Sequence, residues 1–214
     1  MLYNIADIKR EIRIALDQNM SSTPLLSVGD IDALSMEDII ESKIADAARI
    51  VQRDAPLHLL DGGKPFGDSI GWFVRKGLGG GYISLPSDFL RLVSFQMSDW
   101  SYPITAAITE DDPLYVLQSS RYEGIKGNPQ NPVVAIASRP TGLVLEFYSC
   151  TAGDGVYVKR ATYIPMPTIS DGYITICENL KPAIIYYAAY LVALSIGEGD
   201  LAAALLNISK ELMQ

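Results

Sequence analysis

The chain has 214 residues with 17 basic and 25 acidic side chains, and its formal net charge of −8 is spread evenly over the two halves. About half of the residues, 49%, are hydrophobic, which supplies enough apolar material for a core and excludes a wholly disordered chain. The acidic balance, without any basic arm, argues against sequence-specific nucleic-acid binding through a cationic face.

The cysteine and histidine content excludes several classes of site. The two cysteines, Cys150 and Cys177, do not form a CxxC pair and are predicted to be buried reduced thiols. His58 is the single histidine, so a zinc site with several His and Cys ligands is excluded. A Ser/His/Asp or Cys/His site would have to use His58, whose apolar neighbours favour a structural role.

The N-terminal region combines a capped helix with a second, longer helix. Charged residues follow the first few positions, which is unlike a signal peptide. Asn4 is placed to cap a helix whose apolar stripe is formed by Ile5, Ile8, Ile12 and Leu16. A polar loop at 21–30 follows, and Ser35 begins a second helix that ends before Pro56. We therefore predict a helical hairpin over residues 1–56.

The middle of the chain is predicted to be a small antiparallel β unit over residues 60–175. The glycine-rich residues 77–81 separate two short strands, and an acidic segment with Pro113 starts a short helix over 110–119. A Gly/Asn/Pro-rich loop covers 122–132. The predicted strands are 72–74, 82–85, 91–97, 133–138, 143–148 and 156–163.

Two helices are predicted over residues 179–214. Asn179 is placed to cap the first, Gly197 ends it, and Asp200 begins the second. Residues 183–196 carry no charge but are shorter than the roughly 20 residues that a membrane span needs, so a buried helix is expected. Because this helix is apolar on all faces, we expect it to be covered on all sides, with a neighbouring subunit contributing.

These elements predict the fold class. We expect a single adaptor-like α+β domain over residues 1–214, in which the N- and C-terminal helices form a helical bundle. An antiparallel β-sandwich or barrel-like unit is expected to be inserted between them.

The glycine run and the acidic clusters resemble catalytic or binding motifs only in part. Residues 77–81 lack the GxxxxGK[ST] pattern of a phosphate loop, and a strand follows where a dinucleotide site needs a helix. Asp30, Asp32 and Glu37 lack the remaining ligands and the glycine of a calcium loop, so helix capping explains them better. The acidic residues 110–112 are interpreted as the start of a helix. Asp88 fits a turn, because no GxSxG elbow accompanies it. The sequence predicts no catalytic, cofactor or metal site.

The remaining candidates are interaction surfaces. Tyrosine offers apolar area with a polar tip, so Tyr186, Tyr187 and Tyr190 are candidates for a subunit contact as well as for plain core positions. Two Gly/Pro-rich loops are expected to reach neighbouring subunits and to become ordered on assembly. The candidate interface residues are Tyr186, Tyr187, Tyr190, Leu191, Gly79, Gly80, Tyr122 and Asn128.

Three segments together resemble a known family. They are KIADAARIVQRDAP at 43–56, GYISLPSDFLRLVSF at 81–95, and LKPAIIYYAAYLVALS at 180–195, the last followed by a second short helix. This order is similar to the head-to-tail adaptor, or ring, proteins of short-tailed bacteriophages, the crAss-like group among them. The resemblance spans nearly the whole chain, and the Leu-Pro-Ser-Asp-Phe-Leu-Arg segment carries most of it.

The resemblance implies a structural virion protein without catalysis or cofactor, located in the neck or tail and assembled in the host cytoplasm. Adaptors of this kind form a homo-oligomeric ring, usually of twelve copies, that docks on the portal protein. A tail protein or second ring lies downstream, DNA passes through the channel without specific binding, and no membrane is involved. The alternatives are another neck or tail-completion protein, a non-viral carbohydrate- or protein-binding module, and a small hydrolase that uses His58.

Overall fold

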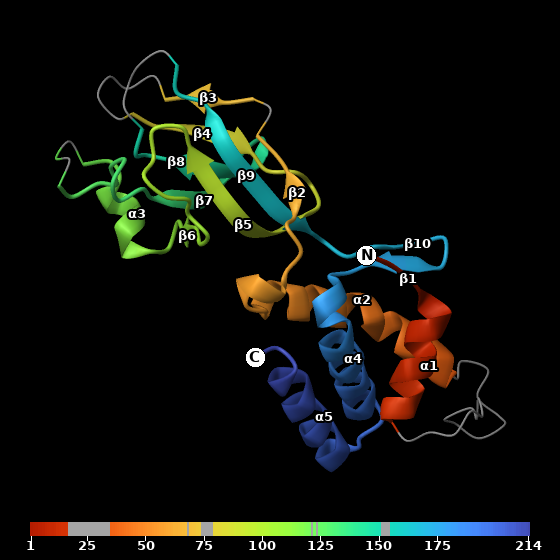
Figure 1. Cartoon of the computed structure of the whole chain (residues 1–214). Coiled ribbons are helices and arrows are strands. Elements are labelled where there is room, and N and C mark those ends of the chain that lie inside the picture. The colour runs from red at the N-terminus through yellow and green to blue at the C-terminus, as the bar shows by residue number, and fades with distance from the viewer. Residues whose placement is uncertain (17–34, 68, 74–78, 121, 123, 151–154) are drawn as a thin grey trace. The chain divides into compact units, whose positions relative to one another are not determined.

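The computed structural model describes residues 1–16, 35–67, 69–73, 79–120, 122, 124–150 and 155–214. It contains both helices and antiparallel sheets, as the sequence predicts, and Figure 1 shows their arrangement within each part. The chain divides into two compact units. The first unit combines Met1–Asp61 with Met166–Gln214, and the second unit is Gly62–Pro165.

The first helix of the first unit forms as its periodicity predicts. Helix α1 spans Ile5–Ala15, and the Asn4 side chain accepts a hydrogen bond of 2.8 Å from the backbone N–H of Ala6. Ile8 and Ile12 are fully buried, so the apolar stripe faces the core. The predicted loop at 21–30 lies outside the described residues.

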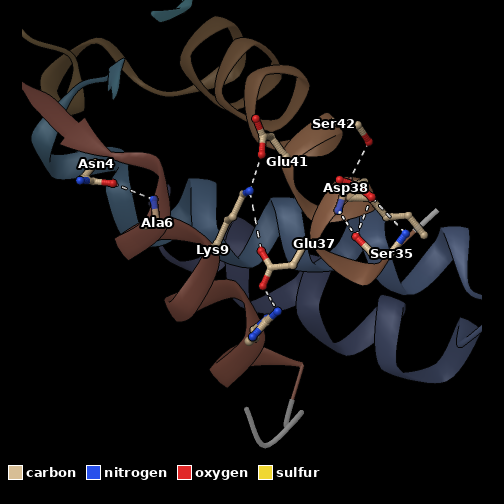
Figure 2. Close-up of polar contacts among 10 residues, drawn as sticks. Asn4, Ala6, Lys9, Ser35, Glu37, Asp38, Glu41 and Ser42 are labelled. Carbon is tan, nitrogen blue, oxygen red and sulfur yellow. Dashed lines mark hydrogen bonds and ion pairs between the residues drawn. The ribbon is translucent and has the colours of Figure 1, made fainter. Parts of the chain in front are cut away.

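Helix α2, Met36–Asp54, begins at a reciprocal cap and is tied to α1 by ion pairs (Figure 2). The Ser35 hydroxyl accepts from the backbone N–H of Asp38, whose carboxylate accepts from the backbone N–H of Ser35. The second hydrogen bond explains why the pKa of Asp38 is lowered, with the Ser35 hydroxyl as its largest cause. Lys9 lies between two α2 glutamates, Glu37 and Glu41, and Arg13 also pairs with Glu37. The two helices are therefore held together by charge as well as by their apolar faces.

Helix α4, Lys181–Ser195, is the centre of the first unit. It packs against α1, α2 and α5, the last of which spans Gly199–Glu211 (Figure 1). Gly197 adopts a φ of +84°, which ends α4 as predicted. The predicted cap at Asn179 is wrong, because this residue lies within a 3-10 turn, η2, of Glu178–Leu180, and no side chain caps α4. Asp200 lies in the first turn of α5 rather than before it.

A small sheet in the first unit was not expected from the sequence. Strand β11, Tyr173–Thr175, pairs with both β1, Leu2–Asn4, and β10, Ile169–Ser170. These strands therefore join the N-terminus to the segment that precedes α4. Buried Gln52 of α2 strengthens this junction, because its side-chain oxygen accepts a 2.9 Å hydrogen bond from the backbone N–H of Cys177. The 3-10 turn η1, Leu57–Leu59, follows α2.

The second unit contains two sheets with different strand content. In the first sheet β9 lies between β2 and β5, and all pairs are antiparallel. In the second sheet the order is β3-β4-β8-β7-β6, antiparallel except for the parallel pair of β6 with β7. Five strands have four or more residues: β4 Gly81–Ser84, β5 Phe89–Met97, β7 Val134–Arg139, β8 Gly142–Phe147 and β9 Val158–Pro165. The edge strands are β2 Lys64–Pro65, β3 Gly71–Trp72 and β6 Ile108–Thr109.

The two sheets of the second unit share one hydrophobic core, but they stay separate. Phe95 of β5 and Phe147 of β8 are fully buried, and their ring centroids lie 5.9 Å apart. The expected sandwich or barrel is wrong in the described residues, because the edge strands of two residues leave both sheets open rather than closed. The coarser expectation of a mixed fold with antiparallel sheets is confirmed. The terminal helices pack in pairs on α4, and the structure shows no further bundle arrangement.

Candidate functional site

The α4 residues chosen from the sequence line one side of a helix that the chain itself largely covers. Tyr186, Tyr187, Tyr190 and Leu191 are all half-buried. The rings of Tyr187 and Tyr190 meet edge to face with centroids 5.3 Å apart. Burial raises the pKa of Tyr187, with smaller contributions from Tyr190 and from Asp54 of α2. Since α1, α2 and α5 already cover α4, the apolar character of this helix does not require a neighbouring subunit.

A groove lies between α1 and the first turns of α4, which we call the α1–α4 groove. It encloses about 290 Å³. An ion pair of 2.7 Å joins Lys181 to Glu11 at its side, and the Lys181 ammonium lies 5.2 Å from the ring centroid of Tyr3. Ile14 is 67% exposed on the α1 wall. The lining residues are Glu11, Ile14, Ala15, Lys181, Pro182, Ile185 and Tyr186.

Gly79 and Gly80 occupy tight backbone positions. Gly79 has a φ of +42°, and its carbonyl accepts a 2.7 Å hydrogen bond from the backbone N–H of Cys150. Gly80 is buried, and a Cβ there would lie 2.4 Å from the backbone oxygen of Phe147. Gly80 therefore permits a close approach of two backbone segments. Residues 77 and 78 of the glycine run lie outside the described residues.

Changing Gly80 to alanine is expected to lower the free energy of unfolding by about 1–3 kcal/mol, because backbone cannot yield to the new methyl group without a shift. Urea denaturation followed by tryptophan fluorescence measures the loss. The matched control is Gly124→Ala, since a Cβ at Gly124 meets nothing within 4 Å. Equal stability of the two variants would contradict a packing role for Gly80.

Tyr122 and Asn128 belong to one loop that closes back on the short helix α3, Pro113–Leu117. Tyr122 is 67% exposed. The Asn128 side chain accepts hydrogen bonds from the backbone N–H groups of Gln130 and Asn131, at 3.0 and 2.9 Å. Asn128 is therefore a turn-forming residue, while Tyr122 presents its ring to solvent.

Helix α3 turns its polar side chains inward and its apolar side chains outward. Gln118, which follows α3, is only 2% exposed; its side chain donates to the carbonyl of Leu114 and accepts from the backbone N–H of Gly127, both at 2.9 Å. The exposed fraction of Val116 is 70%. We call the exposed apolar side chains of this region the α3 patch: Leu114, Val116, Leu117, Tyr122 and Ile125. The sequence analysis found only Tyr122 of this set.

A buried ionic network holds α3 against the second sheet. Glu146 of β8 is 1% exposed, and its carboxylate accepts from the Arg139 guanidinium, with an Nε–Oε1 distance of 2.8 Å. The hydroxyl of Tyr115 donates to the same carboxylate at 3.1 Å, and that of Tyr148 also donates to it. Burial, followed by the hydrogen bond to Glu146, raises the pKa of Tyr148. Four side chains thus satisfy one another inside the unit.

The acidic residues at 110–112 have separate structural roles. Asp112 caps α3, as its side chain accepts a 2.8 Å hydrogen bond from the backbone N–H of Leu114. Glu110 accepts a 3.0 Å hydrogen bond from the backbone N–H of Ser138 on β7. The helix is shorter than the predicted 110–119, because its cap is Asp112 rather than an earlier residue.

The residues weighed for catalysis lie in structural settings. His58 is exposed on η1. Asp88 accepts a 2.7 Å hydrogen bond from Tyr163 and pairs with Lys64 at 3.5 Å, which fits its predicted turn position. Asp30 and Asp32 lie outside the described residues. Within the described ranges, no group of three or more His, Cys, Asp and Glu side chains is placed to hold a metal ion.

Both cysteines are free and buried, as predicted. Burial raises the pKa of Cys150 to about 12, and it also raises that of Cys177. Neither thiol is therefore a reactive thiolate at neutral pH. We expect both to resist Ellman's reagent in the folded protein and both to react after denaturation. Labelling of either cysteine in the folded protein at the rate of a free thiol would contradict this prediction.

Comparisons with known proteins leave the family open. No protein-family model matches the chain, and no curated protein is similar enough in sequence to count as a relative. Of the helices that the structure describes, none is long and apolar enough to cross a membrane. The two candidate surfaces are thus the α1–α4 groove of the first unit and the α3 patch of the second.

Proposed function

We propose that this chain is a head-to-tail adaptor protein of a short-tailed bacteriophage, acting by stoichiometric assembly rather than catalysis. It forms a ring, of about twelve copies by analogy with the adaptors it resembles, between the portal protein and the next tail component. The finer architecture of that family, a bundle of terminal helices with an inserted β-sandwich, is part of this proposal.

The observation that carries the proposal is the insertion of one unit into the other. The chain leaves the helical unit after Asp61 and returns to it at Met166. The three segments that resemble adaptors fall on corresponding elements: residues 43–56 end α2, residues 81–95 span β4 to β5, and residues 180–195 form α4. A helical unit interrupted by a β-rich unit is thus combined with the adaptor-like segment order.

Charge and exposed surface also support an assembly role. A net charge of −8 per copy would give a ring whose channel repels DNA phosphates and lets the genome pass without binding it. The α3 patch exposes five apolar side chains that no described part of its own unit covers. Exposed apolar groups gathered in this way mark interaction sites.

Quantitative mass spectrometry of purified particles tests the proposal. We expect the chain to be present in particles of the phage that encodes it, at a copy number equal to that of the portal protein, and to be bound by the purified portal in a pull-down. Absence from particles would overturn the proposal. Presence at a tail position away from the portal, seen by electron cryomicroscopy, would replace it with another neck or tail-completion protein.

Native mass spectrometry of the purified chain separates the proposal from a binding module. A closed ring of about twelve copies is the expected species, formed either alone or on addition of the portal. A monomer under both conditions, with a melting temperature that rises on addition of a carbohydrate or peptide ligand, would favour the binding module instead.

A further inference from the structure

The α3 patch is held rigidly in its exposed position. The side chain of Gln118 ties the end of α3 to Gly127, and Tyr115 is bonded to the buried Glu146. Rotation of α3 that buried Val116 or Leu117 would break these hydrogen bonds and leave buried polar groups without partners. The patch is therefore a fixed, convex apolar surface, and a partner must cover it if it is to leave water.

The α1–α4 groove is a concave apolar surface on the other unit. Its walls are two helices that pack against each other, and Lys181 and Glu11 pair across them. Ile14 stands exposed on one wall. The groove can therefore accept apolar side chains from a partner, and its shape is the opposite of that of the α3 patch.

The charges beside the two surfaces are also opposite. Exposed Glu110 and Asp111 immediately precede α3. Beside the groove, exposed Arg10 lies one helical turn before Ile14, on the same face of α1. Lys181 and Glu11 offset each other there. Opposite charges around apolar centres orient two surfaces and disfavour other pairings.

We propose that the α3 patch of one copy docks in the α1–α4 groove of a second copy. The two surfaces are different, so each copy in such a contact still offers one unused surface of each kind. The contact is head to tail and repeats until a ring closes. The inference rests on the proposed function in that this contact would build the adaptor ring, and it names the two surfaces that do so.

Cross-linking between two single-cysteine variants tests the contact. Ile14→Cys places a thiol on the groove wall, and Val116→Cys places one on the patch; both positions are at least 67% exposed, so folding is preserved. The native cysteines are buried and do not compete. The two variants are mixed, oxidised mildly and analysed by non-reducing electrophoresis. We expect the mixed Ile14→Cys/Val116→Cys dimer to exceed both homodimers by about tenfold, since only it forms across a docked contact.

Matched controls come from exposed apolar residues outside both surfaces. Leu2→Cys replaces Ile14→Cys in the first unit, and Tyr157→Cys replaces Val116→Cys in the second; the native side chains are 64% and 62% exposed. A mixed dimer no more abundant than that of the controls would overturn the proposal. Predominant Val116→Cys homodimers would overturn it too, because they would show that patch meets patch.

Charged variants provide an independent readout in sedimentation velocity. Ile14→Asp and Val116→Asp are each expected to weaken self-association by about tenfold or more, because a carboxylate would be desolvated in the contact. Mixing the two variants is expected to restore a dimer, since the intact patch of one fits the intact groove of the other. Failure to restore it would contradict a head-to-tail contact.

These experiments need no virus particle, so their failure can be distinguished from failure of the proposed function. A chain present in particles without the mixed cross-link keeps the adaptor role and loses these two surfaces. A chain absent from particles with the mixed cross-link keeps the surfaces and loses the adaptor role.

Discussion

Replacing Arg139 with methionine is expected to lower the free energy of unfolding of the second unit by about 3–5 kcal/mol. Glu146 is almost fully buried, and Arg139 is the cation that bonds to its carboxylate. Without the guanidinium, the carboxylate keeps only two tyrosine hydroxyls as described partners. A buried charge that has lost its counter-ion is costly because water cannot replace the missing solvation.

The companion variants separate the loss of an attraction from the isolation of a buried charge. Glu146→Leu combined with Arg139→Met removes both charges, so we expect the double variant to be more stable than Arg139→Met alone. Arg160→Met is the matched control, as Arg160 is an exposed arginine on β9 of the same unit. Its effect is expected to stay within about 0.5 kcal/mol.

Urea denaturation followed by tryptophan fluorescence measures these stabilities locally, because Trp72 and Trp100 both lie in the second unit. A double variant less stable than Arg139→Met would contradict the explanation by an uncompensated charge. Since the same network positions Tyr115, loss of order in α3 is expected to accompany the loss of stability.

The helices of the first unit could be predicted from the sequence, since the signals that define them are local. The spacing of Ile5, Ile8 and Ile12 indicates a buried stripe, and all three are buried. The cap at Ser35 and the stop near Pro56 act within one turn of the chain, so no tertiary contact is needed to recognise them. The cap at Asn179 failed because the chain first makes a 3-10 turn there, which a local pattern does not distinguish from a helical turn.

The small sheet of the first unit could not be predicted, because its strands are short and far apart in sequence. Tyr3 pairs with Ile174. Three residues at an N-terminus carry too little alternation to indicate a strand, and their partner strand was assigned to the β unit instead.

The two surfaces of the proposed contact illustrate the limits of sequence patterns for sites. Leu114, Val116 and Leu117 read as core residues, because apolar residues in a short helix usually face inward. Their exposure follows from Gln118 and Tyr115, whose partners Gly127 and Glu146 are distant in sequence. Glu146 itself stands in an apolar strand, and its burial depends on the side chains that cover β8 on both faces.

Replacing Phe95 with alanine is expected to produce the other large loss, about 3–5 kcal/mol of unfolding free energy. The Phe95 side chain is fully buried where the two sheets of the second unit meet. Its ring lies 5.5 Å from that of Trp100 and 5.9 Å from that of Phe147, centroid to centroid. Removing it leaves a cavity between β5 and β8 that the surrounding strands cannot fill by a local shift.

The size of the substituent decides between a cavity and a specific ring contact. Phe95→Leu retains most of the volume, so it is expected to cost about 1.5 kcal/mol or less, and Leu143→Ala on the exposed side of β8 is expected to stay within about 0.5 kcal/mol. Urea denaturation with the same fluorescence readout compares the three variants. Equal losses for Phe95→Leu and Phe95→Ala would show that the aromatic contacts with Trp100 and Phe147, rather than filled volume, hold the sheets together. In the expected order, apolar volume shared by two open sheets stabilises the unit that carries the α3 patch, and the ionic network fixes the patch upon it.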